Sequence, residues 1–412
     1  MDGFVDFITD PDLYPSKTGA APGAETVMMR VNHVYRTLGY LHTYLGISCE
    51  DLTLERIVVF CPIKTAKRKA SNFDDVRRIE QDAEIAAEET LEIARSCLRG
   101  LRKHRQISPG SEVLFLESWI AVAKWLYHKE TNTLQFKNYE DVPVITLLRE
   151  EFCKAKLKAE KADPVIDESL KWLDWPDFLA FVRQLERECL PNYKGGTKRS
   201  EKAIAASYQR YLIAAILAYL PPDRQRTLRE LQQGKTLVKG FLRQAGNNVW
   251  IEESDDGLWY IHLGEGDYKT FQSYGEQFHL VPDILYPYLE AWLNKWRAVL
   301  NPQHSFVFTQ KDGKPYSTAS SLLSVFKRAA YRITGQATTP HLVRHMIITH
   351  LKQQGASDAV MQSLAAAMHH SEKAQRKYYD RRNSYEQGSQ AHEVMLQVAL
   401  HCSSTTLSPR LQ

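Results

Sequence analysis

One stretch near the carboxyl end of this 412-residue chain holds the residues best suited to chemistry. These residues are His341, Arg344, His369, His370, Tyr378 and Tyr379. Pro340 favours the start of a helix, and His341 and Arg344, three residues apart, then share one helical face. Cations around the phosphate oxygens and a hydroxyl nucleophile are what phosphoryl transfer needs when no metal takes part. The stretch therefore indicates transfer of a phosphate group to a tyrosine.

The order and spacing of these residues resemble the tyrosine recombinase, or phage integrase, family. The family's motif is His-x-x-Arg on a helix, a histidine or tryptophan after a second helix, and the nucleophilic tyrosine nine residues later. His341 and Arg344 match the first part, and Tyr379 lies nine residues beyond His370. The resemblance implies a site-specific recombinase that integrates, excises or resolves a DNA element. It would form a 3′-phosphotyrosyl link and need neither a metal nor a nucleotide cofactor.

A register shifted by one residue pairs His369 with Tyr378 at the same spacing. We prefer His370 and Tyr379 because the family's histidine is usually followed by serine, and Ser371 follows His370. The chain departs from the family at one position here, because a glycine usually precedes the histidine and His369 stands in its place.

Two arginines can fork onto the non-bridging oxygens of one phosphate, so Arg344 needs a partner. The family carries this partner in the motif Arg-x-x-Glu-Leu-x-x-Leu, ahead of a small sheet. Arg224 fits the motif best, although Thr227 stands where the family has glutamate and residues 221–223 replace a turn that contains glycine. Arg226 is the alternative for this role.

A general acid must protonate the leaving 5′ oxygen, and the family uses a lysine on a β-hairpin between the two arginine motifs. Lys269 is the only lysine between residues 258 and 294. It lies between two strand-like segments, so the resemblance assigns it this role. The remaining assignments are that Arg224 and Arg344 hold the phosphate, and that His341 and His370 assist proton transfer and stabilise charge.

A metal site is a competing interpretation of the histidines, because His341, His345 and His350 lie on or near one helix. The glutamate of a His-Glu-x-x-His motif is missing, however, and Arg344 would bring positive charge to a cation site. The six cysteines show no Cys-x-x-Cys spacing, and no glycine-rich phosphate loop occurs. We therefore expect neither a zinc hydrolase nor an enzyme that uses ATP.

The elements that position such a site follow from the hydrophobic pattern. Hydrophobic residues make up 43% and charged residues 25% of the chain, which is typical of a globular protein with room for two domains. Helical periodicity dominates before residue 190. Strand-like segments occur at 249–252, 258–263 and 278–281, with a hairpin turn at 255–257. We predict a mainly α N-terminal domain and a mixed α/β domain with helices around a small antiparallel sheet. The resemblance to tyrosine recombinases implies that the first domain binds DNA and that the second is catalytic.

Changes in composition suggest five parts of the chain. They are a flexible arm at 1–28, a helical domain at 29–188, a linker at 189–200, a domain at 201–390 that holds the candidate catalytic residues, and a C-terminal helix and tail at 391–412. The resemblance implies that 29–188 is a core-binding DNA-clamp domain and that 201–390 is the catalytic domain. The arm is rich in proline, glycine and small residues, and the linker contains proline and a glycine pair. The resemblance implies that the terminal helix docks onto a neighbouring protomer.

The formal net charge is only +4, so a DNA partner has to be inferred from local clusters of basic residues. These clusters comprise Lys64, Lys67, Arg68, Lys69, Arg102, Lys103, Arg105, Lys198 and Arg199. A solvated surface with favourable charge at a helix end is the competing interpretation. Next to a catalytic half of this kind, we interpret the clusters as contacts to DNA phosphates.

The resemblance also implies partners and a location. The partner would be double-stranded DNA with specific recombination sites, bound by a homotetramer that assembles through the C-terminal helix from free monomers or weak oligomers. The longest apolar run, 211–220, is too short to cross a bilayer, so we expect a cytoplasmic, DNA-associated protein of a prokaryote or mobile element, with no membrane partner. A type IB topoisomerase, a telomere-resolving enzyme and a non-catalytic DNA-binding protein on the same scaffold remain alternatives.

Overall fold

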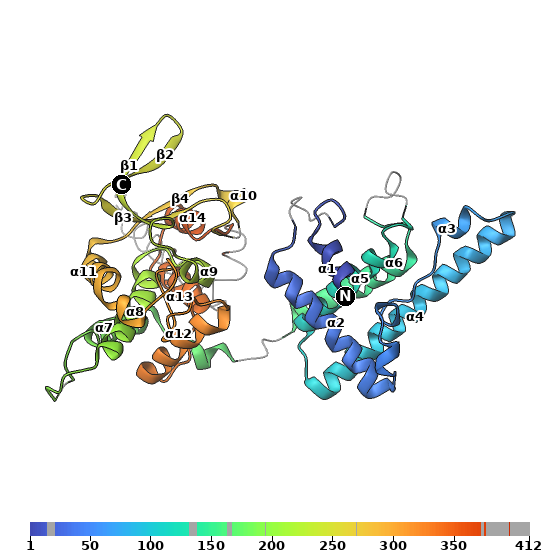
Figure 1. Cartoon of the computed structure of the whole chain (residues 1–412), viewed down its shortest axis with the longest axis horizontal. Coiled ribbons are helices and arrows are strands. Elements are labelled where there is room, and N and C mark those ends of the chain that lie inside the picture. The colour runs from blue at the N-terminus through green and yellow to red at the C-terminus, as the bar shows by residue number, and fades with distance from the viewer. Residues whose placement is uncertain are drawn as a thin grey trace, which may run out of the picture. The chain divides into compact units, whose positions relative to one another are not determined.

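The computed structural model describes residues 1–14, 21–131, 138–162, 167–193, 195–268 and 270–371, together with Gln375 and Met395. The chain divides into two compact units, residues 1–166 and 167–412 (Figure 1). Each unit has its own hydrophobic core and is described by itself. None of the described helices is long and apolar enough to cross a membrane.

Helices are the regular secondary structure of the N-terminal unit in its described residues. Its α-helices are α1 (Asp2–Thr9), α2 (Ala24–Leu45), α3 (Lys64–Lys67), α4 (Phe73–Arg105), α5 (Pro109–Tyr127) and α6 (Pro143–Lys161), with 3-10 turns at Cys49–Asp51 and Leu54–Arg56. Side chains cap the long helices: Asn72 accepts the first-turn N–H of α4, and Ser108 that of α5. The buried side chains of α5, Trp119 and Tyr127 among them, form the centre of the core.

The predicted flexible arm at 1–28 is wrong in the residues that the structure describes. Phe4, Phe7 and Ile8 of α1 are buried in the core of the N-terminal unit, and α2 already begins at Ala24. The spacing of these three apolar residues gives α1 one apolar face, which packs against α2 and α5. The small residues that follow α1 in the sequence concealed this short helix.

The C-terminal unit surrounds a small sheet with helices. Its elements are α7 (Trp175–Arg187), α8 (Glu201–Tyr219), α9 (Gln225–Arg229), β1 (Leu237–Ala245), β2 (Asn248–Glu253), β3 (Leu258–Leu263), α10 (Phe271–Tyr274), β4 (Gln277–Leu280), α11 (Tyr286–Ala291), α12 (Ala319–Thr334), α13 (Pro340–Gln353) and α14 (Asp358–Ala367). Shorter 3-10 turns lie at Glu168–Lys171, Asp283–Leu285 and Ala298–Leu300, and a π-helical turn lies at Trp292–Trp296. The predicted fold class is confirmed: a helical N-terminal unit and a mixed unit with a small antiparallel sheet.

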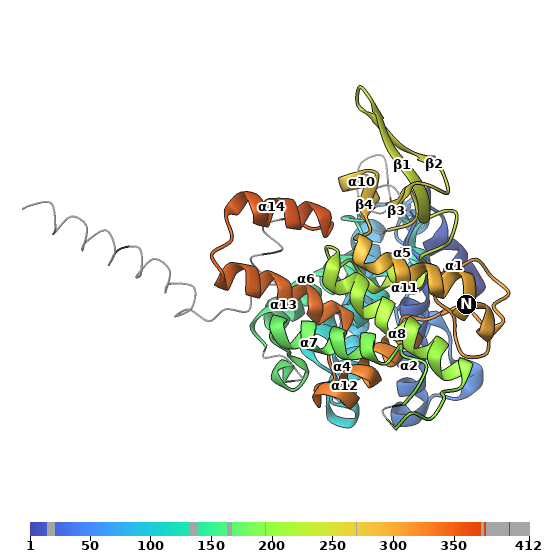
Figure 2. The ribbon, with the colours of Figure 1, turned by 90° about the vertical axis from the view of Figure 1, so that its left-hand side faces the viewer.

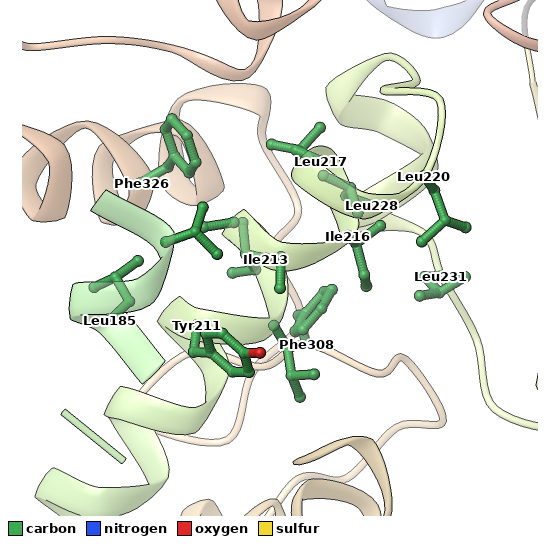
Figure 3. Packing of buried hydrophobic residues seen from close by; sticks show 14 of the residues in the cluster. Leu185, Tyr211, Ile213, Ile216, Leu217, Leu220, Leu228, Leu231, Phe308 and Phe326 are labelled. Carbon is green, nitrogen blue, oxygen red and sulfur yellow. The ribbon is translucent and has the colours of Figure 1, made fainter. Parts of the chain in front are cut away.

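Helix α8 is the centre of this unit. Its residues from Tyr211 to Leu217 are buried, and they pack with α7, α9 and α12 in one cluster (Figure 3). Helices α13 and α14 follow α12 and pack on each other through Ile348, Met361 and Met368 (Figure 2). Leu342, Val343 and Met346 of α13 belong to the main cluster, so they attach the site residues on α13 to the core of the unit.

The boundary between the two units differs from the predicted linker at 189–200. Phe178, Phe181 and Leu185 of α7 belong to the C-terminal core, so the division comes before α7. Residues 190–193 and 195–199 lie inside the C-terminal unit, with a bridge between Asn192 and Lys198. The proline and glycines of this segment therefore mark a turn and not a linker.

The sheet has the strand order β2-β1-β3-β4, with every neighbouring pair antiparallel. Strand β1 was not predicted, and both β2 and β3 pair with it, so the turn at 255–257 does not join two paired strands. Gly240 of β1 pairs with both neighbours. A Cβ on Gly257 would lie 2.3 Å from the Cα of Gly240, so only glycine allows the chain to pass β1 this closely. The outer half of the β1–β2 hairpin extends away from the helices (Figure 1).

Candidate active site

The first turn of α13 presents His341 and Arg344, as predicted. Thr339 caps the helix by accepting the N–H of Leu342, and Pro340 occupies the first turn. The two side chains have different surroundings, since His341 is exposed and Arg344 has no exposed surface. The pair therefore offers one group to solvent and one to the interior of the unit.

The guanidinium of Arg344 joins two segments that are far apart in the sequence. Nη1 donates to the carbonyl of Pro222 over 2.6 Å, and Nη2 donates to the carbonyl of Met368 over 2.8 Å. Nη1 also lies 3.7 Å from Oδ1 of Asp223. Arg344 is thus held rigidly between the turn before α9 and the end of α14.

His370 lies directly beside this guanidinium, with its Nδ1 3.1 Å from Nη2 of Arg344. Nδ1 also lies 3.3 Å from the carbonyl oxygen of Met368. The shorter contact is to a guanidinium, which only donates hydrogen bonds, so we assign Nδ1 as the acceptor and place the proton of the neutral ring on Nε2. Burial and the charge of Arg344 lower the pKa of His370 to about 4. At neutral pH His370 is therefore an uncharged imidazole with an N–H donor on Nε2.

Arg224 meets His341 and Arg344 at a hollow of about 260 Å³, which is also lined by Gln225, Leu323, Thr339 and Pro340. Nη1 of Arg224 is buried and has no hydrogen-bond partner among the described residues. A buried guanidinium N–H without a partner is costly unless it binds an acceptor such as a phosphate oxygen. The hollow therefore has the size and the donors to seat an anion.

Arg226, the alternative to Arg224, is directed elsewhere. Its Nε donates to Glu230 over 2.8 Å, and its Nη2 donates to the carbonyl of Gly266 over 3.1 Å. It is exposed and does not line the hollow. This geometry favours Arg224 as the second arginine of the site.

The structure adds Asp223 and His369 to the surroundings of Arg344, and the sequence interpretation gave neither of them a role in the preferred register. Nδ1 of His369 lies 3.3 Å from Oδ1 of Asp223, and the side chain of His369 has no exposed surface. Burial alone would raise the pKa of Asp223, but contacts with His369, Thr227 and the N–H of Arg224 hold it below its ordinary value. The signal was present in the sequence, since both residues stand where the resembled family has glycine or a turn containing glycine.

Several predicted site residues lie outside the described part of the chain. They are Lys269, the tyrosines Tyr378 and Tyr379, and the C-terminal helix and tail apart from Met395. The neighbours of Lys269 are described: the ring of Tyr268 lies 4.3 Å from that of His369, and Oγ1 of Thr270 donates to the carbonyl of His369 over 3.4 Å. The described residues on either side of position 269 therefore lie against His369.

The histidines on α13 form a pair. Nε2 of His341 lies 3.3 Å from Nε2 of His345, which is buried. Within the part of the chain that the structure describes, no three histidine, cysteine or carboxylate side chains are placed to hold a metal ion. A metal centre made of the described residues is therefore not supported by the geometry.

The basic residues predicted to contact DNA fall into two groups. Four of them bind other parts of the protein: Lys64 donates to the carbonyl of Thr131, Lys67 pairs with Glu80, Arg102 pairs with Glu112, and Arg199 donates to acceptors in residues 188–207. The side chains of the other five are exposed and have no ion-pair or hydrogen-bond partner among the described residues: Arg68, Lys69, Lys103, Arg105 and Lys198. The second group is the one available to bind phosphates.

Part of the chain is similar to proteins of a known family. Residues 255–385 match the model of the phage integrase family. Tyrosine recombinase XerC of Staphylococcus haemolyticus (strain JCSC1435) is 28% identical over 119 residues, which are 28% of this chain and 37% of that protein's length.

Solved recombinase structures also resemble this one. A complex of the XerH site-specific recombinase with its palindromic difH substrate, after cleavage, has a TM-score of 0.45 and 11% identity, over 89% of this chain and 95% of that one. The XerA recombinase has a TM-score of 0.36 and 12% identity, over 96% of this chain and 97% of that one.

Proposed function

Because residues 255–385 place this chain in the phage integrase, or tyrosine recombinase, family, we propose that the protein is a site-specific DNA recombinase. It cleaves and rejoins DNA strands through a 3′-phosphotyrosyl intermediate, and its reaction integrates, excises or resolves a DNA element. Double-stranded DNA with specific sites is the substrate.

One observation carries this proposal. Arg224, His341 and Arg344 come from two distant segments of the sequence and line one hollow of about 260 Å³. His370, from a third segment, contacts Arg344. Two guanidinium groups with imidazoles beside them suit a phosphodiester whose charge grows during reaction.

The reaction conserves the energy of the phosphodiester bond. The phenol oxygen of Tyr379 attacks the phosphorus, a bond between this oxygen and phosphorus forms, and the bond between phosphorus and the 5′ oxygen breaks. The phenol proton passes to His341, and Lys269 gives a proton to the leaving 5′ oxygen. Attack by the 5′ hydroxyl of a partner strand reverses these steps and releases Tyr379.

The positive charges of the site lower the activation barrier for attack on the phosphodiester. An ordinary tyrosine has a pKa of about 10, so its phenolate needs a positive environment, which Arg224 and Arg344 supply. The same arginines bind the non-bridging oxygens. The N–H on Nε2 of His370 adds a neutral donor to these oxygens, and no metal is needed.

Parts of the chain outside the active site bind the DNA and assemble the protein on it. The N-terminal unit and residues 195–199 bind DNA phosphates through Arg68, Lys69, Lys103, Arg105 and Lys198. The C-terminal helix, in the helix and tail at 391–412, docks onto a neighbouring protomer. A tetramer thereby forms on two DNA sites and couples cleavage to assembly. The protein acts in the cytoplasm of a prokaryote or on behalf of a mobile element.

Covalent capture tests this proposal. The full-length protein is incubated with nicked fragments of its host's DNA, denatured, and the attached DNA is sequenced, with Tyr379→Phe and Tyr378→Phe in parallel. We expect attachment through a 3′ phosphate at one recurrent sequence, lost in Tyr379→Phe and retained in Tyr378→Phe. Loss only in Tyr378→Phe would move the register by one residue.

Other outcomes identify the alternatives. Attachment spread over unrelated sequences, with relaxation of supercoiled plasmid, indicates a topoisomerase. Hairpin products from a palindromic site indicate telomere resolution. DNA binding without any attachment, with purified protein and with host extract alike, indicates a non-catalytic scaffold and contradicts the proposal.

A further inference from the structure

A carboxylate and an imidazole meet behind the guanidinium of Arg344. Oδ1 of Asp223 lies 3.3 Å from Nδ1 of His369 and 3.7 Å from Nη1 of Arg344. His369 has no exposed surface, and Asp223 is largely buried. Neither residue lines the hollow that Arg224, His341 and Arg344 form, so neither is placed to touch a bound phosphate.

Asp223 holds the turn that leads to Arg224. Its Oδ1 accepts the backbone N–H of Arg224 over 2.6 Å, and its Oδ2 accepts the hydroxyl of Thr227 over 2.5 Å. These two bonds fix the start of α9 relative to the carboxylate. The direction in which Arg224 leaves the backbone therefore depends on where Asp223 is held.

His369 holds the segment between β3 and β4. Its ring lies 4.3 Å from the ring of Tyr268, and its carbonyl accepts the hydroxyl of Thr270. Its backbone has a φ of +56°, a left-handed conformation that costs a residue with a Cβ about 1 kcal/mol. The chain keeps a histidine there although glycine would adopt this conformation freely, which points to a role for the ring.

We propose that Asp223 and His369 are a positioning pair. The pair connects the turn that presents Arg224, the guanidinium of Arg344 and the segment on either side of residue 269, and thereby keeps them in register for cleavage. This inference rests on the proposed recombinase function. It assigns no contact with substrate to either residue, and it explains why two departures from the family pattern lie against each other.

The substitution His369→Gly tests the role of the imidazole ring apart from that of the left-handed backbone conformation. Glycine relieves the left-handed strain but removes the contacts with Asp223 and Tyr268. We expect the rate of covalent attachment to nicked DNA to fall by about tenfold or more, because small misplacements of reacting groups slow catalysis strongly. Binding of the same DNA should stay unchanged.

A second readout does not depend on activity. Amides of residues 273–275 bond to carbonyls of Thr270 and Phe271, so their hydrogen exchange reports how firmly this segment is held. We expect exchange several-fold faster in His369→Gly. The matched control is Asn301→Gly, at an exposed position with a φ of +52°, which should change neither readout.

A double-mutant cycle tests whether the two residues act together. Asp223→Asn, His369→Gln and the double variant are compared by rate of attachment. We expect the double variant to be no slower than the slower single variant, because either change already breaks the pair. If His369→Gly fails to fold, His369→Asn takes its place, since asparagine tolerates the left-handed conformation.

The outcomes separate this inference from the proposed function. The positioning pair would be refuted if His369→Gly kept the wild-type rate of covalent attachment and the wild-type hydrogen exchange. It would also be refuted if the losses of rate in Asp223→Asn and His369→Gln multiplied in the double variant. The recombinase function would stand in both cases. If the wild-type protein forms no covalent link, the proposed function fails. Hydrogen exchange is then the only test of the positioning pair. Faster exchange in His369→Gly supports the pair, and unchanged exchange refutes it.

Discussion

Nη2 of Arg344 lies 3.1 Å from Nδ1 of His370, and this contact distinguishes the two neighbouring histidines. The ring of His370 is directed to the arginine of the site, whereas the ring of His369 is directed to Asp223 and Tyr268. The contact supports the register that pairs His370 with Tyr379. The contact is also the basis for placing the proton of the neutral His370 ring on Nε2. Together with burial, the charge of Arg344 lowers the pKa of this ring, which makes the stability of the fold depend on pH.

The contact between Arg344 and His370 predicts a loss of stability in acid. The pKa of His370 is about 4 in the folded chain and about 6.5 in the unfolded chain, so the unfolded chain binds more protons between these values. The stabilisation is complete above pH 6.5 and is lost as the pH falls towards 4, by up to about 3 kcal/mol. The free energy of unfolding in urea should therefore differ less between pH 5 and pH 7.5 in His370→Gln than in the wild type. The same substitution at exposed His104 should leave the difference unchanged, and an unchanged difference in His370→Gln would contradict the assignment.

Arg224 and Arg226 offer a matched comparison two residues apart. Arg224→Gln removes a donor from the hollow and should slow covalent attachment to DNA by about a hundredfold or more. Arg226→Gln breaks only its bonds to Glu230 and Gly266, so the rate should stay within about threefold of the wild type. Quench-flow measurement of attachment compares the two variants. A larger loss of attachment rate in Arg226→Gln than in Arg224→Gln would make Arg226 the second arginine of the site.

Arg344 should contribute to stability as well as to reaction. Arg344→Gln leaves the carbonyls of Pro222 and Met368 without their buried donor, and we expect a loss of about 3 kcal/mol in the free energy of unfolding. Arg224→Gln should not destabilise, because the buried Nη1 of Arg224 has no protein partner among the described residues. Urea unfolding of both variants tests this contrast, and equal stability of the two would refute it.

Lys198 and Arg199 are neighbours with different expected roles. Lys198 is exposed, so Lys198→Gln should weaken DNA binding and reduce the slope of log affinity against log salt by about one. The guanidinium of Arg199 donates to the carbonyls of Leu190 and Ala203 and to Ser207, so Arg199→Gln should mainly lower the melting temperature. Fluorescence anisotropy at several salt concentrations and thermal unfolding compare the two. A steeper loss of DNA affinity in Arg199→Gln would contradict this division.

Two helical glycines of the N-terminal unit should respond in opposite directions to alanine. Nothing lies within 4 Å of a Cβ added to Gly39 in α2, so Gly39→Ala should stabilise the unit by about 0.5–1 kcal/mol. A Cβ on Gly100 in α4 would lie 2.1 Å from the ring of Tyr40, so Gly100→Ala should destabilise it by about 1–3 kcal/mol. Thermal unfolding measures both changes. Changes of the same sign would show that the packing of α2 on α4 is described wrongly.

Local patterns in the sequence determined much of the fold. Pro340 predicted the start of α13, and apolar periodicity predicted most of the other helices. Short elements were harder to find. Helix α1 has only eight residues, and β1 carries a glycine and exposed residues along its outer half, so neither gives a strong periodic signal.

The sequence also determined which chemistry the chain can offer, because the spacing of His341, Arg344 and His370 is a property of one short stretch. It could not choose between Arg224 and Arg226, or see that Asp223 faces His369. Those relationships join segments about 120 to 150 residues apart, and only the packing of α8, α13 and α14 brings them together. Local spacing constrains which side chains share a helix face, whereas contacts between distant segments depend on how whole elements bury their apolar surfaces, and that is decided by the tertiary structure.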